Sequence, residues 1–258
     1  MNHLVDIIIR AKDGHELTHS LITSIAMNTD LAMFNIILVD DGSDPPYDTI
    51  EDVTHIRHPH ARGAVSATNS GIAAALLTDA PFVLIMDNDT EIPDGDTGWL
   101  DRFIQELKDA GGATACVGAT SNFVNPPQHI LSVPQTYAAD VKDVGAKDNP
   151  AVPWFVSFCV LFHKHVLRNM PLWDEQYNPG NYEDTDYAMQ VRCGGLEIRV
   201  AQSVYIHHKG HSTFGDDMTK LLTTNKEKFY MKWGVGRLLD MGFISPSELK
   251  KASPNATN

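Results

Sequence analysis

The sequence predicts an α/β fold with one doubly wound, mostly parallel sheet. Short runs of β-branched and other apolar residues alternate along the chain with longer segments whose apolar residues recur at helical spacing. Two of the apolar runs pass directly into acidic residues, in ILVDDGSD at 37–44 and in FVLIMDNDTEIP at 82–93. Alternating strands and helices are typical of a parallel sheet, and open sheets of this kind bind ligands at the carboxyl ends of their strands.

The first elements follow this alternation closely. Residues 5–9 (VDIII) and 34–39 (FNIILV) are short runs rich in β-branched residues, so each predicts a strand. Between them, 16–27 (ELTHSLITSIAM) carries apolar residues at helical spacing and predicts a helix. A short third strand is expected at 54–57 (THIR).

The alternation continues with three further elements. The alanine-rich segment 66–77 predicts a helix, because alanine has the highest helix propensity. The apolar run 82–86 predicts a buried strand, and the amphipathic segment 99–110 predicts the next helix.

The second half of the chain is less regular. Residues 122–153 are rich in Pro, Asn and Asp and show no period, so we expect a long loop, of a length that often serves a function. The apolar run 154–162 predicts another buried strand, and 198–206 a final strand. Helices are expected at 184–193 and 219–233.

Composition limits the class of protein. The chain has 258 residues, of which 43% are apolar and 21% charged, as in ordinary soluble globular proteins. The net charge of −13 argues against non-specific binding to nucleic acid or to an anionic membrane. The three cysteines, Cys116, Cys159 and Cys193, are far apart, so we expect buried free thiols in a reducing compartment. No apolar stretch is long enough for a signal peptide or a membrane span, which predicts a cytoplasmic protein, peripheral at a membrane if its substrate lies there.

Two acidic clusters follow predicted strands. Asp40 and Asp41 end the second strand, where a carboxylate could accept hydrogen bonds from a nucleobase or ribose, although an Asp-Gly-Ser turn explains them equally well. Asp87 and Asp89 flank Asn88 after the strand at 82–86. Hard divalent cations prefer carboxylate oxygens, and a turn at Asn88 would let one Asp hold a metal while the other holds a ribose.

The second half adds a third cluster and a group of histidines. Glu183 and Asp184 open a predicted helix, where capping competes with catalysis as an explanation. His207, His208 and His211 follow the final strand directly. A lone histidine is more often a packed or surface residue than a ligand, but an imidazole here would complete a metal site begun by a carboxylate.

Taken in order, the motifs resemble a known family. IIIRAKDGHEL, ILVDDGSD, ARGAVSATNSGIAAA, FVLIMDNDTEIP, VSFCVLFHKHVL, NYEDTDYAMQVRCGG and VYIHHKGHSTF together are similar to family 2 glycosyltransferases of the GT-A fold, over 5–233. The resemblance implies a single Rossmann-like GT-A domain at 1–251 with a C-terminal helical extension. Its parts would be a nucleotide-sugar-binding half (1–120), an acceptor and catalytic half (121–214) and C-terminal helices (215–251), followed by a disordered tail (252–258).

The resemblance also implies a nucleotide-sugar donor and a divalent cation, Mn²⁺ or Mg²⁺. By motif position, Asp89 would be the chief metal ligand, assisted by Asp87 and by His207 or His208, both of which fit the motif. The catalytic base would be Asp184, paired with Glu183. The residues implied in binding the nucleotide-sugar are Arg10, Lys12, Asp40, Asp41, Arg62, Asn69, Asp87 and Asn88.

Two departures from the family pattern concern the donor side. The first strand ends in Arg10-Ala-Lys12-Asp, where many members have Pro-Thr-Tyr-Asn, and we expect Arg10 and Lys12 to meet phosphate. Ala61 stands where an Asn is frequent, while Arg62 and Asn69 keep the pattern. Neither departure touches the expected metal ligands or the base.

The expected activity is transfer of a sugar, UDP being the favoured carrier, to a hydroxyl of a saccharide or lipid-linked acceptor. A direct displacement inverts the anomeric centre, so we expect inversion with Asp184 as base. Around the Glu-Asp pair, Trp173 is expected to be packing, while Trp154 and Tyr182 are open between packing and sugar contact.

Three alternatives remain at this point. A nucleotidyltransferase or sugar-nucleotide hydrolase would also use strand-end carboxylates, but the chain lacks a phosphate-binding GxxxxGK[ST] motif. A catalytically silent GT-A domain could bind a glycan or act as a scaffold. A transferase that glycosylates a modified nucleic-acid base is disfavoured by the negative net charge, and nucleic acid is an unlikely partner.

Overall fold

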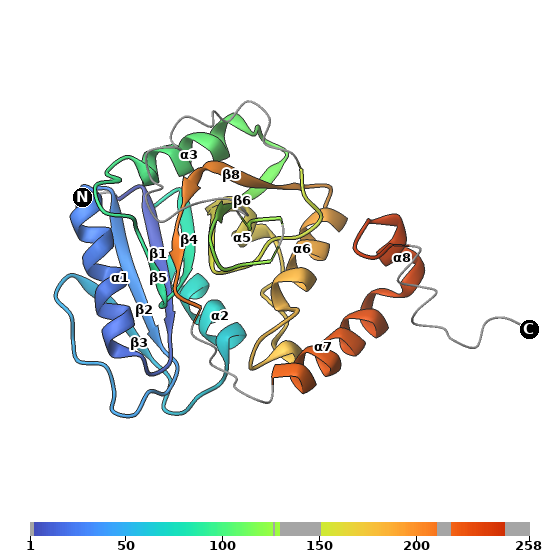
Figure 1. Cartoon of the computed structure of the whole chain (residues 1–258), viewed down its shortest axis with the longest axis horizontal. Helices are drawn as coiled ribbons and strands as arrows, with labels where there is room; N and C mark the ends of the chain where they lie inside the picture. The colour runs from blue at the N-terminus through green and yellow to red at the C-terminus, as the bar shows by residue number, and fades with distance from the viewer. Residues whose placement is uncertain (1–2, 126, 130–150, 211–217, 246–258) are drawn as a thin grey trace, which may run out of the picture. The chain divides into compact units, whose positions relative to one another are not determined.

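The computed structural model of the chain (Figure 1) describes residues 3–125, 127–129, 151–210 and 218–245. They belong to two compact units, Met1–Thr213 and Phe214–Asn258, which are treated separately below. Within the described part, every helix is too short or too polar to cross a bilayer.

The first unit is built on a seven-stranded sheet that is mostly parallel, with the strand order β3-β2-β1-β4-β7-β6-β8. In this order β7 alone runs antiparallel to both of its neighbours. The predicted α/β fold with a mostly parallel sheet is confirmed. The strands are β1 (Val5–Ala11), β2 (Phe34–Asp40), β3 (Val53–Arg57), β4 (Phe82–Asp87), β6 (Thr114–Thr120), β7 (Cys159–His163) and β8 (Glu197–Tyr205).

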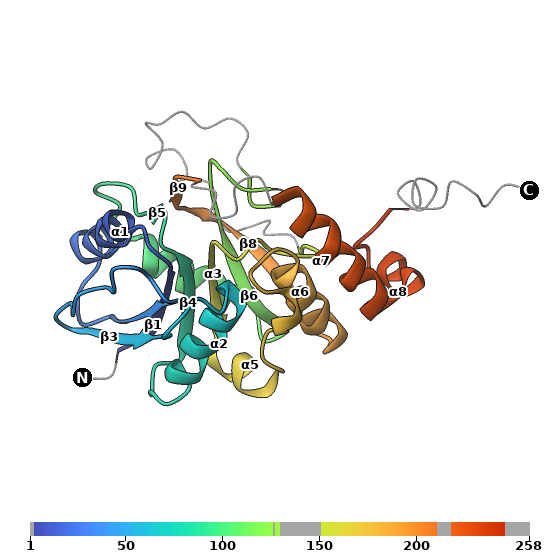
Figure 2. The same cartoon turned by 90° about the horizontal axis from the view of Figure 1, so that it is seen from below.

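Helices cover both faces of this sheet (Figures 1 and 2), as a doubly wound fold requires. They are α1 (His15–Asn28), α2 (Ala64–Ala75), α3 (Trp99–Asp109), α5 (Lys164–Asn169) and α6 (Glu183–Cys193), with a 3₁₀ turn η2 (Glu175–Tyr177).

Alternation along β1 decides which residue meets which helix. Ile7 and Ile9 share a core with Leu21 of α1 and Phe103 of α3. Ile8 points to the other face, where α2 approaches so closely that a Cβ on Gly71 would lie 2.3 Å from the Ile8 side chain. The glycine therefore sets the distance between α2 and the sheet.

The structure corrects several expected elements. The strand expected at 154–162 begins only at Cys159, and residues 155 and 158 instead bury Phe side chains from irregular backbone. The sequence did not predict β6, whose small residues (TACVGAT) lack a strong β pattern. Helix α5 and a short helix α8 (Val235–Asp240) were also missed. Much of the loop expected at 122–153, and the tail at 252–258, lie outside the described residues.

The cysteines are free, as expected, but only Cys116 and Cys159 are buried. Cys193 is exposed, because it stands in the last turn of α6. The expectation of buried thiols was therefore wrong for Cys193.

The second unit contains α7 (Met218–Trp233) and α8, separated by Gly234 with a φ of 73°. Phe229 of α7 packs on Phe243, with ring centroids 5.9 Å apart.

Candidate active site and metal centre

The candidate site lies at the edge of the sheet where the parallel strands end. Arg10 at the end of β1 is in register with Asp87 at the end of β4, and Ala11 with Asp40 at the end of β2. Since β7 runs the other way, its first residue, Cys159, pairs with Met86 at this same edge. Side chains from both halves of the chain therefore meet here.

Asp87, Asp89 and His208 form the core of the site. One ligand atom from each lies within 4.8 Å of the others, which is the spacing of a candidate metal site. The chain turns at Asn88, as anticipated, and continues into a short strand β5 (Thr90–Glu91). That strand pairs antiparallel with β9 (His207–His208), and Figure 2 shows the two short strands. Their pairing brings the late histidine to the two aspartates.

His208 is held by four neighbours, Asn122, Phe123, Phe158 and Asp89. Asn122 binds its backbone at both ends, accepting from the His208 N–H at 2.9 Å and donating to its carbonyl at 3.1 Å. The imidazole stacks on Phe158 with centroids 5.3 Å apart. Its Nδ1 lies 2.7 Å from the carbonyl oxygen of Phe123, and its Nε2 lies 3.1 Å from Oδ1 of Asp89.

These contacts determine what His208 can bind. A carbonyl oxygen only accepts, so Nδ1 must carry a proton, and in the neutral ring Nε2 then presents a lone pair to Asp89. Two acceptors this close need a proton or a cation between them. Burial lowers the pKa of His208, but the hydrogen bond to Asp89 and the charges of Asp87 and Asp89 outweigh it, and the pKa lies above its ordinary value. Two carboxylates and an oriented imidazole fit a divalent cation such as Mn²⁺.

His207 does not join this cluster among the described residues. It precedes His208 in β9, where adjacent side chains point to opposite sides, and its Nδ1 lies 3.4 Å from the Tyr205 hydroxyl. The third histidine of the motif, His211, lies outside the described residues.

Arg10 lies buried beneath Asp87, with 6% of its side chain exposed. It forms an ion pair with Asp87 Oδ1 and donates to the Thr68 hydroxyl at 3.1 Å and the Ser157 carbonyl at 3.0 Å. Alternation along β1 turns Arg10 toward α2, and its contact with phosphate stays a prediction.

Lys12 and Arg62, the two other cations implied in binding the nucleotide-sugar, are exposed. Lys12 follows β1 and lies 2.6 Å from Asp13, and Arg62 precedes α2 and lies 3.4 Å from Glu175. Both side chains are therefore accessible from solvent.

Asp40 and Asp41 each organise backbone. Asp40 accepts from the Ser43 N–H at 2.8 Å and pairs with Arg57. Burial alone would raise the pKa of Asp40, but hydrogen bonds from Ser43, Tyr47 and Arg57 hold it below its ordinary value.

Asp41 holds the turn that leads into α2. It accepts from the N–H groups of Arg62 at 2.9 Å and Gly63 at 2.7 Å, and from His58 Nδ1 at 2.6 Å. Asp41 thus fixes the conformation of the turn before α2.

Asn69 and Asn88, which the resemblance implies in donor binding, make contacts within the protein. Asn69 binds the backbone of Trp173 twice, accepting at 3.0 Å and donating at 2.9 Å, so its amide joins α2 to the segment before α6. Asn88 donates to the Thr18 hydroxyl of α1 at 3.0 Å. Trp173 itself is buried and stacks on Tyr187, which confirms its expected packing role.

Glu183 and Asp184 open α6 after two non-glycine residues with left-handed φ, Asn181 (71°) and Tyr182 (70°). Such conformations cost free energy, and they are concentrated at functional sites. Asp184 Oδ1 accepts from the Thr185 N–H at 2.6 Å, and Oδ2 accepts from the Ser157 N–H at 3.4 Å. Burial raises the pKa of Asp184 despite these bonds.

Glu183 is more deeply buried than Asp184. Its Oε2 has no hydrogen-bond partner among the described residues. Burial, followed by the charge of Asp184, raises the pKa of Glu183 to about 8. Both carboxyl groups therefore hold a proton more readily than exposed ones do.

Sequence reasoning missed the residues that hold the site together. Asn122 and Phe123 follow β6, the strand that the pattern did not show, and Ser157 lies in a segment expected to be strand. No local pattern indicated these residues, because β6 consists of small residues.

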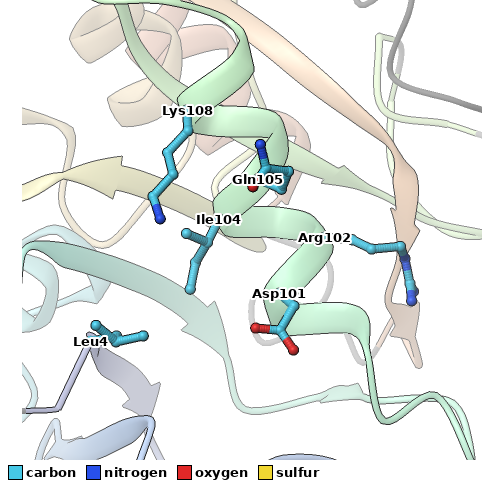
Figure 3. Close-up of a pocket in the computed structure, with 6 residues that line it drawn as sticks. All are labelled: Leu4, Asp101, Arg102, Ile104, Gln105 and Lys108. Carbon is cyan, nitrogen blue, oxygen red and sulfur yellow. The ribbon is translucent and has the colours of Figure 1, made fainter.

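A separate hollow of about 330 Å³ lies between α3 and the start of β1 (Figure 3). Leu4 precedes β1, so this hollow lies at the amino-terminal edge of the sheet, opposite the site described above. Its lining residues are Leu4, Asp101, Arg102, Ile104, Gln105 and Lys108.

The sequence of the chain matches a known protein family. The profile of Glycosyl transferase family 2 matches residues 6–170, well over half of the chain. The pre-mycofactocin glycosyltransferase of Mycobacterium tuberculosis is 23% identical over 223 residues, covering 82% of this chain and 44% of that protein. The O-antigen biosynthesis protein RfbC of Myxococcus xanthus is 23% identical over 244 residues, covering 82% of this chain and 18% of that protein. The chain thus spans less than half the length of either relative.

Among solved structures, GalNAc-T7 in complex with UDP, GalNAc and Mn²⁺ has a similar fold. The TM-score is 0.61 at 13% sequence identity, and the match covers 97% of this chain and 54% of that one. The shared fold is GT-A.

Proposed function

The chain belongs to glycosyl transferase family 2, and from this premise we propose that it is a metal-dependent glycosyltransferase. The reaction would move a sugar from a nucleoside diphosphate, UDP being favoured, to a hydroxyl of a saccharide or lipid-linked acceptor, with inversion. The observation that carries the proposal is the grouping of Asp87, Asp89 and His208 at the same sheet edge as Asp184.

The residues present fit a divalent cation, Mn²⁺ or Mg²⁺. Asp89, the Nε2 of His208 and the oxygen of Asp87 that Arg10 leaves free would hold it. When bound, such a cation stabilises negative charge on a diphosphate leaving group. GalNAc-T7 was solved with UDP and Mn²⁺, which supports this choice of nucleotide and metal.

Asp184 is proposed as the base. An acceptor hydroxyl is a poor nucleophile, and a carboxylate within hydrogen-bond reach removes its proton as it attacks. The raised pKa of Asp184 makes it a stronger base than an exposed aspartate, and burial raises the pKa of the neighbouring Glu183 as well. The bonds from Thr185 and Ser157 fix the direction of the Asp184 carboxylate.

We propose that the donor's remaining contacts are made by residues outside the cluster of Asp87, Asp89 and His208. The exposed Lys12 and Arg62 can meet the diphosphate, while Asp41 holds the turn that a nucleoside would contact. The curated relatives have names that point to different acceptors, so the acceptor is proposed only as a class. We propose a cytoplasmic location, at the membrane surface if the acceptor is lipid-linked.

The test is calorimetric titration of UDP with and without Mn²⁺ into wild type, Asp89→Ala and Asp101→Ala. Asp101 is an exposed aspartate on α3, far from the site, and serves as the matched control. We expect Asp89→Ala alone to lose the Mn²⁺-dependent part of UDP binding. Equal Mn²⁺-dependent binding in wild type and Asp89→Ala would refute the metal assignment. Binding without any sugar transfer would instead favour a catalytically silent GT-A domain.

A further inference from the structure

Arg10 is a buried cation with an unusual set of partners. One of its terminal nitrogens contacts three groups: the Asp87 carboxylate, the Ser157 carbonyl at 3.0 Å and the Ser157 hydroxyl at 3.3 Å. The other terminal nitrogen donates to Thr68 on α2. A guanidinium stays charged at any pH the protein meets, so this charge is permanent.

The contacts of Ser157 extend this arrangement to the proposed base. Its backbone N–H donates to Asp184 Oδ2 at 3.4 Å, while its carbonyl and hydroxyl accept from Arg10. A continuous path therefore runs from Asp87 through Arg10 and Ser157 to Asp184. It joins the side of the site that would hold the donor to the side that would activate the acceptor.

The charge of Arg10 also acts on the cation site. Asp87 contributes a negative charge to the cluster, and Arg10 neutralises part of it at hydrogen-bond distance while occupying one of its two carboxylate oxygens. A cation entering the cluster would meet less negative charge than two aspartates normally provide. A nucleoside diphosphate is negatively charged, so its binding would supply the negative charge that Arg10 neutralises.

We propose that Arg10 is a positioning residue with two effects. It holds Asp87 in a fixed relation to Asp184, and it weakens the affinity of the nucleotide-free cluster for a divalent cation, so that tight cation binding requires the donor's diphosphate. The second effect rests on the proposed metal dependence.

The experiment compares Arg10→Gln, which removes the positive charge, with Arg10→Lys. The lysine keeps the charge but lacks the planar guanidinium, whose nitrogens donate to several groups at fixed angles. The free Mn²⁺ concentration is measured by electron paramagnetic resonance, with and without UDP, and kcat and KM are measured in parallel. The matched control is Lys164→Met. The Lys164 side chain is as buried as that of Arg10, and it forms an ion pair with Asp6 at 2.9 Å, near the amino-terminal end of β1.

For Arg10→Gln we expect Mn²⁺ alone to bind about tenfold more tightly, equivalent to about 1.4 kcal/mol. The further gain from UDP should shrink by the same factor, and kcat should fall with little change in KM. Arg10→Lys should keep the wild-type affinity for Mn²⁺ and lose kcat. Lys164→Met should lower the melting temperature and leave Mn²⁺ affinity unchanged.

Unchanged or weaker Mn²⁺ binding in a folded Arg10→Gln protein would overturn the charge effect. Wild-type kcat in Arg10→Lys would overturn the positioning effect, and this variant decides the matter if Arg10→Gln does not fold. Failure of the proposed function has a different signature, because wild type itself would then show no Mn²⁺-dependent UDP binding.

Discussion

Binding of a divalent cation should release a proton from His208. In the metal-free protein the ring donates from Nδ1 to Phe123, and its raised pKa favours a second proton on Nε2, facing Asp89. A cation can bind Nε2 only after that proton leaves. Below the pKa of His208, cation affinity should therefore rise with pH, and above it the affinity should become independent of pH.

The size of the effect follows from the release of one proton. Each pH unit below the pKa of His208 costs a factor of about ten in the apparent dissociation constant for Mn²⁺, or about 1.4 kcal/mol. Because the charges of Asp87 and Asp89 raise this pKa above the ordinary 6.5, the dependence should persist through pH 6.5.

The measurement is calorimetric titration of Mn²⁺ between pH 5.5 and 8 in buffers of different ionisation enthalpy, which counts the protons released. His208→Ala should bind Mn²⁺ weakly and lose the pH dependence. His207→Ala, the adjacent residue of β9, is the matched control and should behave as wild type. The reasoning would be refuted if wild type released no proton, or if His207→Ala rather than His208→Ala abolished the dependence.

Four further predictions concern substitutions of Asp184, Glu183, Asn122 and Gly71. Asp184→Asn should bind UDP with Mn²⁺ as wild type does and lose sugar transfer, as measured by released UDP. Glu183→Gln should change the pH dependence of stability. The folded-state pKa of about 8 exceeds the ordinary 4.5, so folded protein binds more protons between these values and wild-type stability should fall as pH rises, by up to about 1.4 kcal/mol per unit. In urea unfolding the Gln variant should lack this slope. Asn122→Ala, which frees the backbone of the histidine ligand, should weaken Mn²⁺ binding by about 10- to 100-fold in the same titration. Gly71→Ala should destabilise by about 1–3 kcal/mol in urea unfolding although alanine favours helices, because its Cβ would meet Ile8.

Local patterns were enough to predict the fold class and the edge of the sheet where the candidate site lies. Apolar runs that alternate with amphipathic segments predicted β1, β2 and β4 and the helices between them, because periodicity is a property of neighbouring residues. The carboxylates of Asp87 and Asp89 could be assigned to one edge of the sheet, because parallel strands end on the same side. The strand β6, made of small residues, carried no such pattern and was missed.

The choice between the two histidines needed the tertiary structure. His207 and His208 fit the same motif, and only the pairing of β5 with β9 decides which imidazole faces Asp89. That pairing joins segments more than a hundred residues apart, which no local pattern specifies.

Arg10 and Asn69 show that local sequence patterns do not specify the partners of polar side chains either. Their residue types fitted a ligand contact, yet Arg10 is buried against Asp87 and Asn69 is bound to the backbone of Trp173. Spacing along the chain was sufficient to predict β1, β2 and β4, the helices between them and the edge of the sheet that gathers acidic residues. The tertiary structure alone decided which polar atoms pair with one another, because hydrogen bonds and ion pairs depend on distances between segments that only the folded chain brings together.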